Sequence, residues 1–376
     1  SSARLQSSEK TVGFVDEISV ADGSKKGIFE NERLIVSATW MPDKSSIILG
    51  MRELHNEVRQ IWQYFPSNKE LIRVTNDNNT YRFPVLNQSG TIISVSQESV
   101  PSTIFLGETG NGGQTIAADN GLFDHLSNLS NGELLVTSFD EGNGAVWILN
   151  RDLTKKQPLT DGKDGVSLRP KLSSDGKSVV FASIRSGNRE LWQINLDGSG
   201  LTQLTFNRRE TIFDGKLLAN NNLIGVSNNK DGYFIWRQPS SGDNVVLDEK
   251  IGFEWDVSPD DKLLVYDKFN QSTKQSEIIV KSLENDQIIK TYQRKITNVL
   301  RWFDQTSFIY QVQDFNKFQV FKQDINQDAP VLIYEHTGEQ NELLRDFVLL
   351  PDGKRFNLIR AKYLSDAVTI RLVGNP

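Results

Sequence analysis

The sequence predicts an all-β fold, an eight-bladed β-propeller made of four-stranded antiparallel blades of about 40–45 residues each. Three observations predict it. One segment, residues 168–206, has the pattern of four short strands separated by tight turns. Two independent sets of marker residues recur at nearly the same interval, and no long helical pattern, linker or low-complexity tract interrupts the repeats. A seven-bladed ring is the alternative.

Residues 168–206 (LRPKLSSDGKSVVFASIRSGNRELWQINLDGSGLTQLTF) show the unit of the repeat. The runs KSVVFASI, ELWQINL and TQLTF read as strands. Between them lie turns at Asp175-Gly176, Gly187-Asn188 and Asp197-Gly198, residue types that tolerate the positive φ of tight hairpins. Because such a sheet cannot bury both faces alone, it needs copies of itself to pack against.

Two sets of marker residues give the period. An aromatic or apolar residue in a short strand recurs every 42 to 48 residues, at Ile18, Trp62, Phe105, Trp147, Trp192, Trp236, Ile279, Phe321 and Thr369. The end of the innermost strand recurs every 40 to 46 residues, at Trp40, Leu86, Asn128, Leu172, Leu217, Val257, Trp302 and Val348. Since Trp62, Trp147, Trp192 and Trp236 share one blade position, we expect them to pack between blades rather than to form a ligand-stacking surface.

The first set has nine members and the second has eight. The simplest explanation is that the N-terminal segment, residues 11–36, closes the ring by pairing with strands after Arg345, which would remove exposed sheet edges. Alternatively, Ile18 belongs to a blade whose first half was lost upstream. We expect residues 1–10 to be a tail or linker and residues 11–376 to form one propeller domain.

Composition narrows the function. The net charge is −6, and Lys and Arg are scattered, which argues against a surface for duplex nucleic acid. There is no apolar run long enough to span a membrane and no signal-peptide pattern. The absence of Cys favours an oxidising, extracytoplasmic compartment, although it also suits a protein that never needed one. The chain begins Ser-Ser without Met, so we expect a processed chain or part of a longer one.

No pattern for catalysis or metal binding is evident. The sequence has no G-x-S-x-G nucleophile motif. His55, His125 and His336 fall in different repeats without metal-ligand spacing, and are expected to be ordinary surface or turn residues. We therefore predict no enzyme activity, no metal and no cofactor.

One set of positions is a candidate binding site. In each repeat, a residue near the start of the innermost strand should face the mouth of the central channel: Ser37, Phe83, His125, Arg169, Asp214, Glu254, Val299 and Asp346. The predicted ligand-binding residues are the polar ones, His125, Arg169, Asp214, Glu254 and Asp346. Propellers use this face because loops of many blades converge there. The alternative is that these side chains only solvate a water-filled channel.

Residues 168–206 resemble the WD40-like or TolB-type β-propeller repeat. That repeat has a loop P-x-x-S-P-D-G, an apolar strand, an S-x-R-x-G-N turn, a Leu-Trp strand, an Asp-Gly turn and a final Leu-Thr. The corresponding residues here are Pro170, 173–176 (SSDG), 179–181 (VVF), 183–188 (SIRSGN), Leu191-Trp192, Asp197-Gly198 and Leu204-Thr205. Ser174 replaces the second loop proline, which Pro259 and Pro351 keep in other repeats.

Nearly the full chain looks like the C-terminal propeller sensor domain attached, in some bacteria, to membrane-bound serine/threonine kinases or winged-helix transcriptional regulators. The segments that carry this resemblance are 60–62 (QIW), 73–77 (RVTND), 300–302 (LRW), 350–355 (LPDGKR) and 360–370, which ends in SDAVTI. The chain itself contains no kinase or helix-turn-helix motif.

These resemblances imply a non-catalytic sensory module that binds a protein or small molecule on its channel-mouth face. It would lie outside the cytoplasmic membrane, tethered only through an upstream span, with a kinase or winged-helix domain upstream and no nucleic-acid binding of its own. The alternative is a TolB-like periplasmic scaffold for protein–protein interaction. A propeller lyase or hydrolase, built around His125 and Arg169, ranks third.

Overall fold

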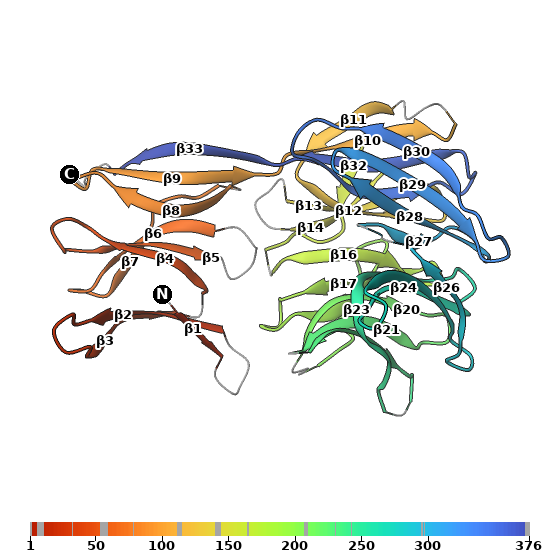
Figure 1. Cartoon of the computed structure of the whole chain (residues 1–376), viewed down its shortest axis with the longest axis horizontal. Coiled ribbons are helices and arrows are strands. Elements are labelled where there is room, and N and C mark those ends of the chain that lie inside the picture. Colours follow the sequence, from red (N-terminus) through yellow and green to blue (C-terminus); the bar gives the residue numbers. More distant parts are fainter. Residues whose placement is uncertain are drawn as a thin grey trace. The chain divides into compact units, whose positions relative to one another are not determined.

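The structure is a computed structural model of the whole chain, shown in Figure 1. It describes residues 2–5, 11–31, 33–52, 59–77, 79–110, 115–139, 144–163, 165–206, 210–229, 231–241, 243–294, 296 and 298–372. All regular elements in these ranges are β-strands, and the described residues include no helix able to cross a membrane. The chain divides into two compact units, which we call the terminal unit (1–100 with 363–376) and the central unit (101–362).

The terminal unit contains three sheets. The first consists of β1 (Ser2–Leu5), β2 (Thr11–Ile18) and β3 (Lys25–Asn31). The second consists of β4 (Ile35–Trp40), β5 (Ile47–Arg52), β6 (Arg59–Phe65) and β7 (Glu70–Arg73). The third has the order β33 (Leu364–Arg371), β9 (Ile92–Ser99) and β8 (Thr80–Leu86).

The described residues of the central unit form five sheets, all antiparallel. What we call the closing sheet has the order β11 (Thr115–Gly121), β10 (Ser102–Glu108), β32 (Arg355–Lys362) and β31 (Glu342–Leu349). The β12 sheet consists of β12 (Phe123–Asn128), β13 (Leu134–Ser138), β14 (Ala145–Leu149) and β15 (Lys156–Pro158). The β16 sheet consists of β16 (Ser167–Leu172), β17 (Ser178–Ser183), β18 (Glu190–Asn195) and β19 (Thr202–Gln203). The β27 sheet consists of β27 (Leu300–Trp302), β28 (Ser307–Asp314), β29 (Lys317–Asp324) and β30 (Val331–Thr337).

The fifth sheet has seven strands because one long strand serves two groups. Its strands are β20 (Thr211–Leu217), β21 (Leu223–Asn229), β22 (Gly232–Gln238), β23 (Val245–Val257), β24 (Leu263–Asn270), β25 (Gln275–Ser282) and β26 (Ile288–Gln293). The first half of β23 pairs with β22 and its second half with β24. The sheet is therefore two four-stranded groups, the β20 group (β20–β23) and the β23 group (β23–β26), that share β23.

Burial along the strands follows the sequence pattern. The second strand of a repeat is mostly apolar and is buried along its whole length, as in β17 (SVVFAS) and β13 (LLVTS). The fourth strand is mostly exposed, as in β15 and β26. The middle strands of each sheet are therefore its most buried part. Their β-branched and apolar side chains pack against the neighbouring sheets on both sides.

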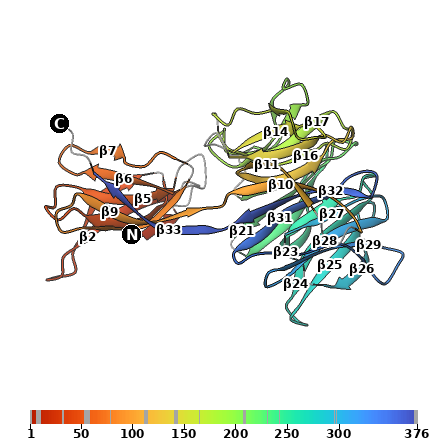
Figure 2. The same ribbon diagram turned by 90° about the horizontal axis from the view of Figure 1, so that it is seen from above.

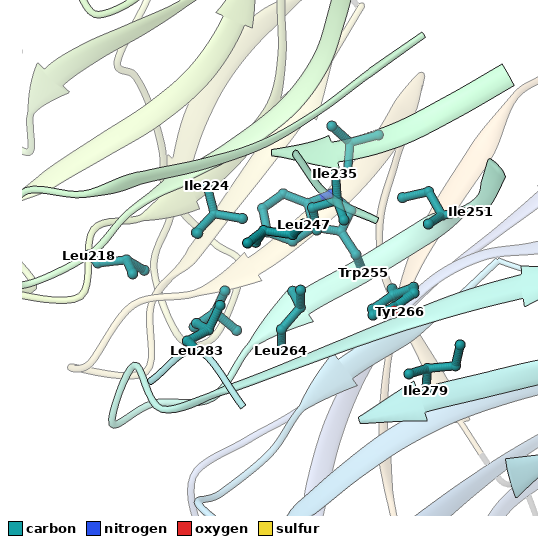
Figure 3. Packing of buried hydrophobic residues seen from close by; sticks show 12 residues of the cluster. Leu218, Ile224, Ile235, Leu247, Ile251, Trp255, Leu264, Tyr266, Ile279 and Leu283 are labelled. Carbon is teal, nitrogen blue, oxygen red and sulfur yellow. The ribbon is translucent and has the colours of Figure 1, made fainter. Parts of the chain in front are cut away.

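Hydrophobic clusters join the six four-stranded groups of the central unit in a cycle. The closing sheet packs on the β12 sheet, the β12 sheet on the β16 sheet and the β16 sheet on the β20 group. The β20 group packs on the β23 group through the cluster in Figure 3, where Trp255 and Tyr266 meet Leu247 and Ile235. The β23 group then packs on the β27 sheet, and the β27 sheet packs on the closing sheet.

The same hydrogen bonds recur in equivalent places of different sheets. Thr75, Thr160 and Thr205 each accept a hydrogen bond through Oγ1 from the backbone N–H fourteen residues earlier, at 2.9 Å in all three cases. Gln63 donates to Ser46 Oγ at 2.9 Å, and Gln193 donates to Ser178 Oγ at 2.8 Å. The repeats therefore share buried polar contacts as well as apolar ones.

The predicted strand positions are confirmed. All eight inner-strand markers lie at or next to the end of a strand at one edge of a sheet or four-stranded group, for example Leu172 at the end of β16 and Val257 at the end of β23. Trp62, Trp147, Trp192 and Trp236 each pack in a cluster that joins two sheets, as expected.

The predicted eight-bladed ring, closed by residues 11–36, is not confirmed. Strand β32 pairs with β10, and β33 pairs with β9, whereas β2 and β3 pair with each other. Figures 1 and 2 both show β10 beside β32. No sheet formed by the described residues closes on itself, and the chain divides into two compact units, 1–100 with 363–376 and 101–362. The single propeller domain over residues 11–376 stays a prediction.

Candidate functional site

The five predicted binding residues lie on the first strands of five groups in the central unit. His125 is on β12, Arg169 on β16, Asp214 on β20, Glu254 on β23 and Asp346 on β31. Each lies at or within a register shift of its strand. Such β-bulges re-aim side chains and are common near functional sites, so a shared backbone irregularity marks the position that the repeat predicted.

Asp346, Arg301 and His125 form the most buried part of the site. Arg301 Nη2 donates to Asp346 Oδ1 at 2.9 Å and to Oδ2 at 2.6 Å, and Arg301 Nη1 donates to the Leu126 carbonyl at 2.7 Å. Asp346 also accepts the backbone N–H groups of Leu126 and Phe347. Charge-assisted pairs of this kind hold both partners in one geometry.

His125 is buried beside this pair. Its Nδ1 lies 3.2 Å from Asp346 Oδ2, and its side chain is 6% exposed. Burial, and then the positive charge of Arg301, hold the pKa of His125 well below its usual range, so the imidazole is neutral at physiological pH. The expectation that His125 is an ordinary surface residue is therefore wrong. His336 is half-buried, with Nε2 3.3 Å from Glu342 Oε1, and His55 lies outside the described residues.

Asp214 is paired with a lysine on the neighbouring strand. Lys171 Nζ lies 2.9 Å from Asp214 Oδ2, and it also donates to the Trp255 carbonyl at 3.3 Å. The ammonium group lies 3.8 Å from the centre of the Trp255 ring, within the range of a cation–π contact. These contacts link β16, β20 and β23.

Arg169 and Glu254 are close but loosely paired. Arg169 Nη2 lies 4.0 Å from Glu254 Oε1, and the guanidinium lies 4.1 Å from the centre of the Phe253 ring. Burial raises the pKa of Glu254 to about 7, despite the opposing charge of Arg169. Asp267 Oδ1 accepts the backbone N–H of Glu254 at 2.9 Å, and burial raises the pKa of Asp267 to about 6.

The structure places the five predicted residues in three groups of contacting side chains, which together we call the inner-strand site: His125 with Asp346 and Arg301, Asp214 with Lys171, and Arg169 with Glu254. It also adds cations that the prediction missed. Lys171 and Arg301 each lie two residues after a predicted position, and Arg345, which pairs with Asp124, precedes Asp346. The two-residue period of a strand places Lys171 and Arg301 on the same face as the predicted positions, so this signal was available. Of the other three positions, Val299 is buried in a hydrophobic cluster, and Ser37 and Phe83 lie in the terminal unit.

The chemistry of the site is ionic. Its carboxylates and cations come from different strands and neutralise one another in a largely buried setting. Within the described ranges no group of three or more His, Asp or Glu side chains is placed to hold a metal ion. Arg169, 24% exposed and only loosely paired, is the member with capacity for another partner.

Comparisons with known proteins point to TolB over part of the chain. No family model matches. A TolB homolog of Chlorobium luteolum is 34% identical over 74 residues, which are 20% of this chain and 16% of that protein. The match thus spans about a sixth of that relative's length.

Three solved structures show weak likeness. TolB from Acinetobacter baumannii is 15% identical with a TM-score of 0.35, over 73% of this chain and 58% of that one. The putative TolB from Agrobacterium tumefaciens is 13% identical with a TM-score of 0.29, over 94% and 99%. Prolyl oligopeptidase B from Galerina marginata is 10% identical with a TM-score of 0.42, over 87% and 54%. By sequence, the chain is similar to a TolB-type protein over one fifth of its length.

Proposed function

We propose that the central unit is a six-bladed β-propeller. Its six four-stranded groups pack one on the next, and the β27 sheet packs back on the closing sheet. The closing sheet combines β10, from the start of the unit, with β31 and β32, from its end. Pairing the first and last strands of the unit in one sheet is the arrangement that joins a propeller's two ends and protects its edges.

The function that we propose is that of a non-catalytic, TolB-like scaffold for protein–protein interaction outside the cytoplasmic membrane. The sequence similarity to the TolB homolog supports the TolB-type assignment. The proposal that the protein is not an enzyme rests on the pairing and burial of the carboxylates in the inner-strand site. Asp346 and Asp214 are each held by a cation and are nearly inaccessible to solvent, at 2% and 4% exposure. Groups neutralised in this way hold the propeller's first strands together and are poorly placed to transfer protons to a substrate.

The sensory interpretation, with an upstream kinase or winged-helix domain, stays a prediction from the resemblance. The lyase or hydrolase interpretation ranks below the scaffold because the imidazole that it requires, His125, is buried against Asp346.

Affinity capture from an envelope extract of the source organism, followed by mass spectrometry and light scattering of the eluted complex, tests the scaffold. We expect one or a few protein partners in stoichiometric amounts, and retention of these partners after washing at moderate salt. Absence of any stoichiometric partner, together with turnover in a screen of peptide, ester and acidic-glycan substrates, would reject the scaffold in favour of an enzyme.

A further inference from the structure

Arg169 has hydrogen-bonding capacity that the protein does not use. A guanidinium group carries five N–H donors, yet Arg169 donates no hydrogen bond to any residue that the structure describes. Arg301, on β27, donates to both oxygens of Asp346 and to the Leu126 carbonyl. The two arginines therefore differ: Arg301 is a structural cation, and Arg169 is available for a further acceptor.

The backbone holds Arg169 in a conformation that L-residues avoid. Its φ is +51°, in the left-handed region, and it lies in the β-bulge between Leu168 and Lys171. A non-glycine residue in this region costs roughly 1–2 kcal/mol, and such strain gathers at functional sites. The bulge sets the direction in which the Arg169 side chain leaves the strand, and the guanidinium lies 4.1 Å from the centre of the Phe253 ring.

The Phe253 ring beside this guanidinium belongs to a cluster of three aromatic rings. The ring centres of Phe213 and Phe253 are 5.6 Å apart, and Tyr233 lies 5.4 Å from the first and 5.2 Å from the second. All three side chains are only half-buried. A second guanidinium, that of Arg189, lies 5.3 Å from the centre of the Phe213 ring. The rings meet edge to face or tilted, at interplanar angles of 77°, 81° and 59°. Half-buried rings beside a cation offer apolar surface next to a positive charge.

We propose that Arg169 and this aromatic cluster bind a carboxylate that carries an aromatic group, with the carboxylate on the guanidinium and the ring against Phe213, Tyr233 and Phe253. The proposal deepens the proposed binding role, on which it rests, by naming the chemistry of the ligand. Two sources share this chemistry: a small aromatic acid, and the C-terminal carboxylate of a partner chain that ends in an aromatic residue.

The neighbouring charges leave room for an anion. The carboxylates whose negative charges raise the pKa of Arg169 are those of Glu254, Asp214, Asp124 and Asp346. Asp124 is paired with Arg345, Asp214 with Lys171 and Asp346 with Arg301. Glu254 is the remaining competitor, and its pKa of about 7 means that much of it is neutral near physiological pH. Burial also raises the pKa of Asp267, whose carboxylate accepts the Glu254 N–H, to about 6. As the pH falls from 8 to 6, protonation of these two carboxylates removes negative charge, so the anion should bind Arg169 more tightly.

Isothermal titration of the full chain with N-acetyl-phenylalanine and with its amide tests the proposal. We expect the free carboxylate to bind roughly 10- to 100-fold more tightly than the amide, because charge-assisted bonds add about 1.5–3 kcal/mol. Arg169→Gln should abolish this difference and Arg169→Lys should keep part of it. Arg355→Gln, a control at a 63% exposed arginine of the same unit, should leave it unchanged. Equal binding of acid and amide, or an unchanged difference in Arg169→Gln, would overturn the proposal.

Phe253→Leu is a second variant, which tests the proposal even if the arginine variants fail to fold. It keeps the guanidinium and should weaken the acid and the amide alike; if it weakens neither, the aromatic half of the proposal is wrong. Phenylacetate and the peptide Gly-Gly-Phe distinguish the two sources, since tighter binding of the peptide indicates a chain terminus and equal or tighter binding of phenylacetate indicates a small acid. Partner capture with Arg169→Gln separates this proposal from the proposed scaffold function. If protein partners are captured but the native chain binds no aromatic carboxylate, only the ligand assignment fails.

Discussion

Arg301 Nη2 lies 2.6 Å from Asp346 Oδ2, and this ion pair connects β27 with β31, which belong to different sheets. Both side chains are largely buried, at 14% and 2% exposure. The same carboxylate accepts the Leu126 N–H from a third sheet at 2.7 Å. One aspartate therefore connects the β27 sheet, the closing sheet and the β12 sheet.

Asp346→Asn should lower the free energy of unfolding by about 3 kcal/mol, because removing one partner of a buried pair leaves the other charge uncompensated. Guanidinium unfolding followed by circular dichroism measures this. Asp314→Asn, at an exposed hairpin residue of the same unit, is the matched control and should change stability by less than about 0.5 kcal/mol. An Asp346→Asn protein as stable as the control would show that the pair contributes no net stability.

Glu254→Gln should change the pH dependence of stability. The folded-state pKa of Glu254 is raised from 4.5 to about 7, so the folded protein holds this proton more tightly than the unfolded chain. The stability from the protonated form is complete below pH 4.5 and is lost as the pH rises through 7. The loss is at most about 3 kcal/mol, at 1.36 kcal/mol per pKa unit.

Glutamine does not titrate, so the variant should gain stability relative to the native chain between pH 4.5 and 8. Unfolding free energies at five pH values would show this. Glu249→Gln, an exposed position of the same strand, serves as the control and should give a flat difference. A flat difference for Glu254→Gln as well would mean that Glu254 keeps an ordinary pKa.

Gly252→Ala should destabilise the central unit by about 2 kcal/mol, as overpacked sites commonly do. A Cβ at Gly252 would lie 1.7 Å from Asp267 Oδ2, and Asp267 cannot move freely because its Oδ1 accepts the Glu254 N–H. Gly27→Ala, where the nearest atom would be 3.8 Å away, should have little effect. In a double-mutant cycle, Asp267→Ala should remove most of the cost of Gly252→Ala; simple additivity would contradict this contact.

Thr75→Val, Thr160→Val and Thr205→Val should each cost about 1–3 kcal/mol, because each leaves one buried backbone N–H without its acceptor. The effect should be largest at Thr205, whose hydroxyl also donates to the buried Glu190 carboxylate. Thermal unfolding of the three variants beside Thr202→Val, an exposed threonine, measures it. Similar stabilities for all four proteins would show that the recurring contact is energetically neutral.

Residues 101–362 should fold without the rest of the chain. Six hydrophobic clusters lie wholly within this range, and the pairing of β10 with β32 is internal to it. Expressed alone, the segment should unfold in a single cooperative transition with the circular dichroism of β-sheet. An unfolded or aggregated segment would contradict both its independence and the proposed six-bladed ring.

The inner-strand site was only half predictable. The repeat located His125, Arg169, Asp214, Glu254 and Asp346 because equivalent positions of a repeated strand occupy equivalent places in the fold. It did not identify which cation neutralises which carboxylate. Lys171 reaches Asp214 on β20, and Arg301 reaches Asp346 on β31, and these choices depend on how each bulge turns its side chain.

The amino-acid sequence alone determined most strands of this protein, the turns between them and the period at which they recur. It placed no strand at Ser2–Leu5, where a tail or linker was expected. Alternation of apolar and polar residues and the φ preferences of Gly, Asn and Asp are local properties, so a chain of this composition expresses them wherever it folds. Tertiary structure decided which strands complete each other's sheets. Strand β10 pairs with β32, and β33 pairs with β9, between partner residues 247 to 279 positions apart in the sequence. Burial of apolar side chains, which local pattern does not specify, selects these pairs. The division into two units, and the ion pairs of the inner-strand site, follow from that selection.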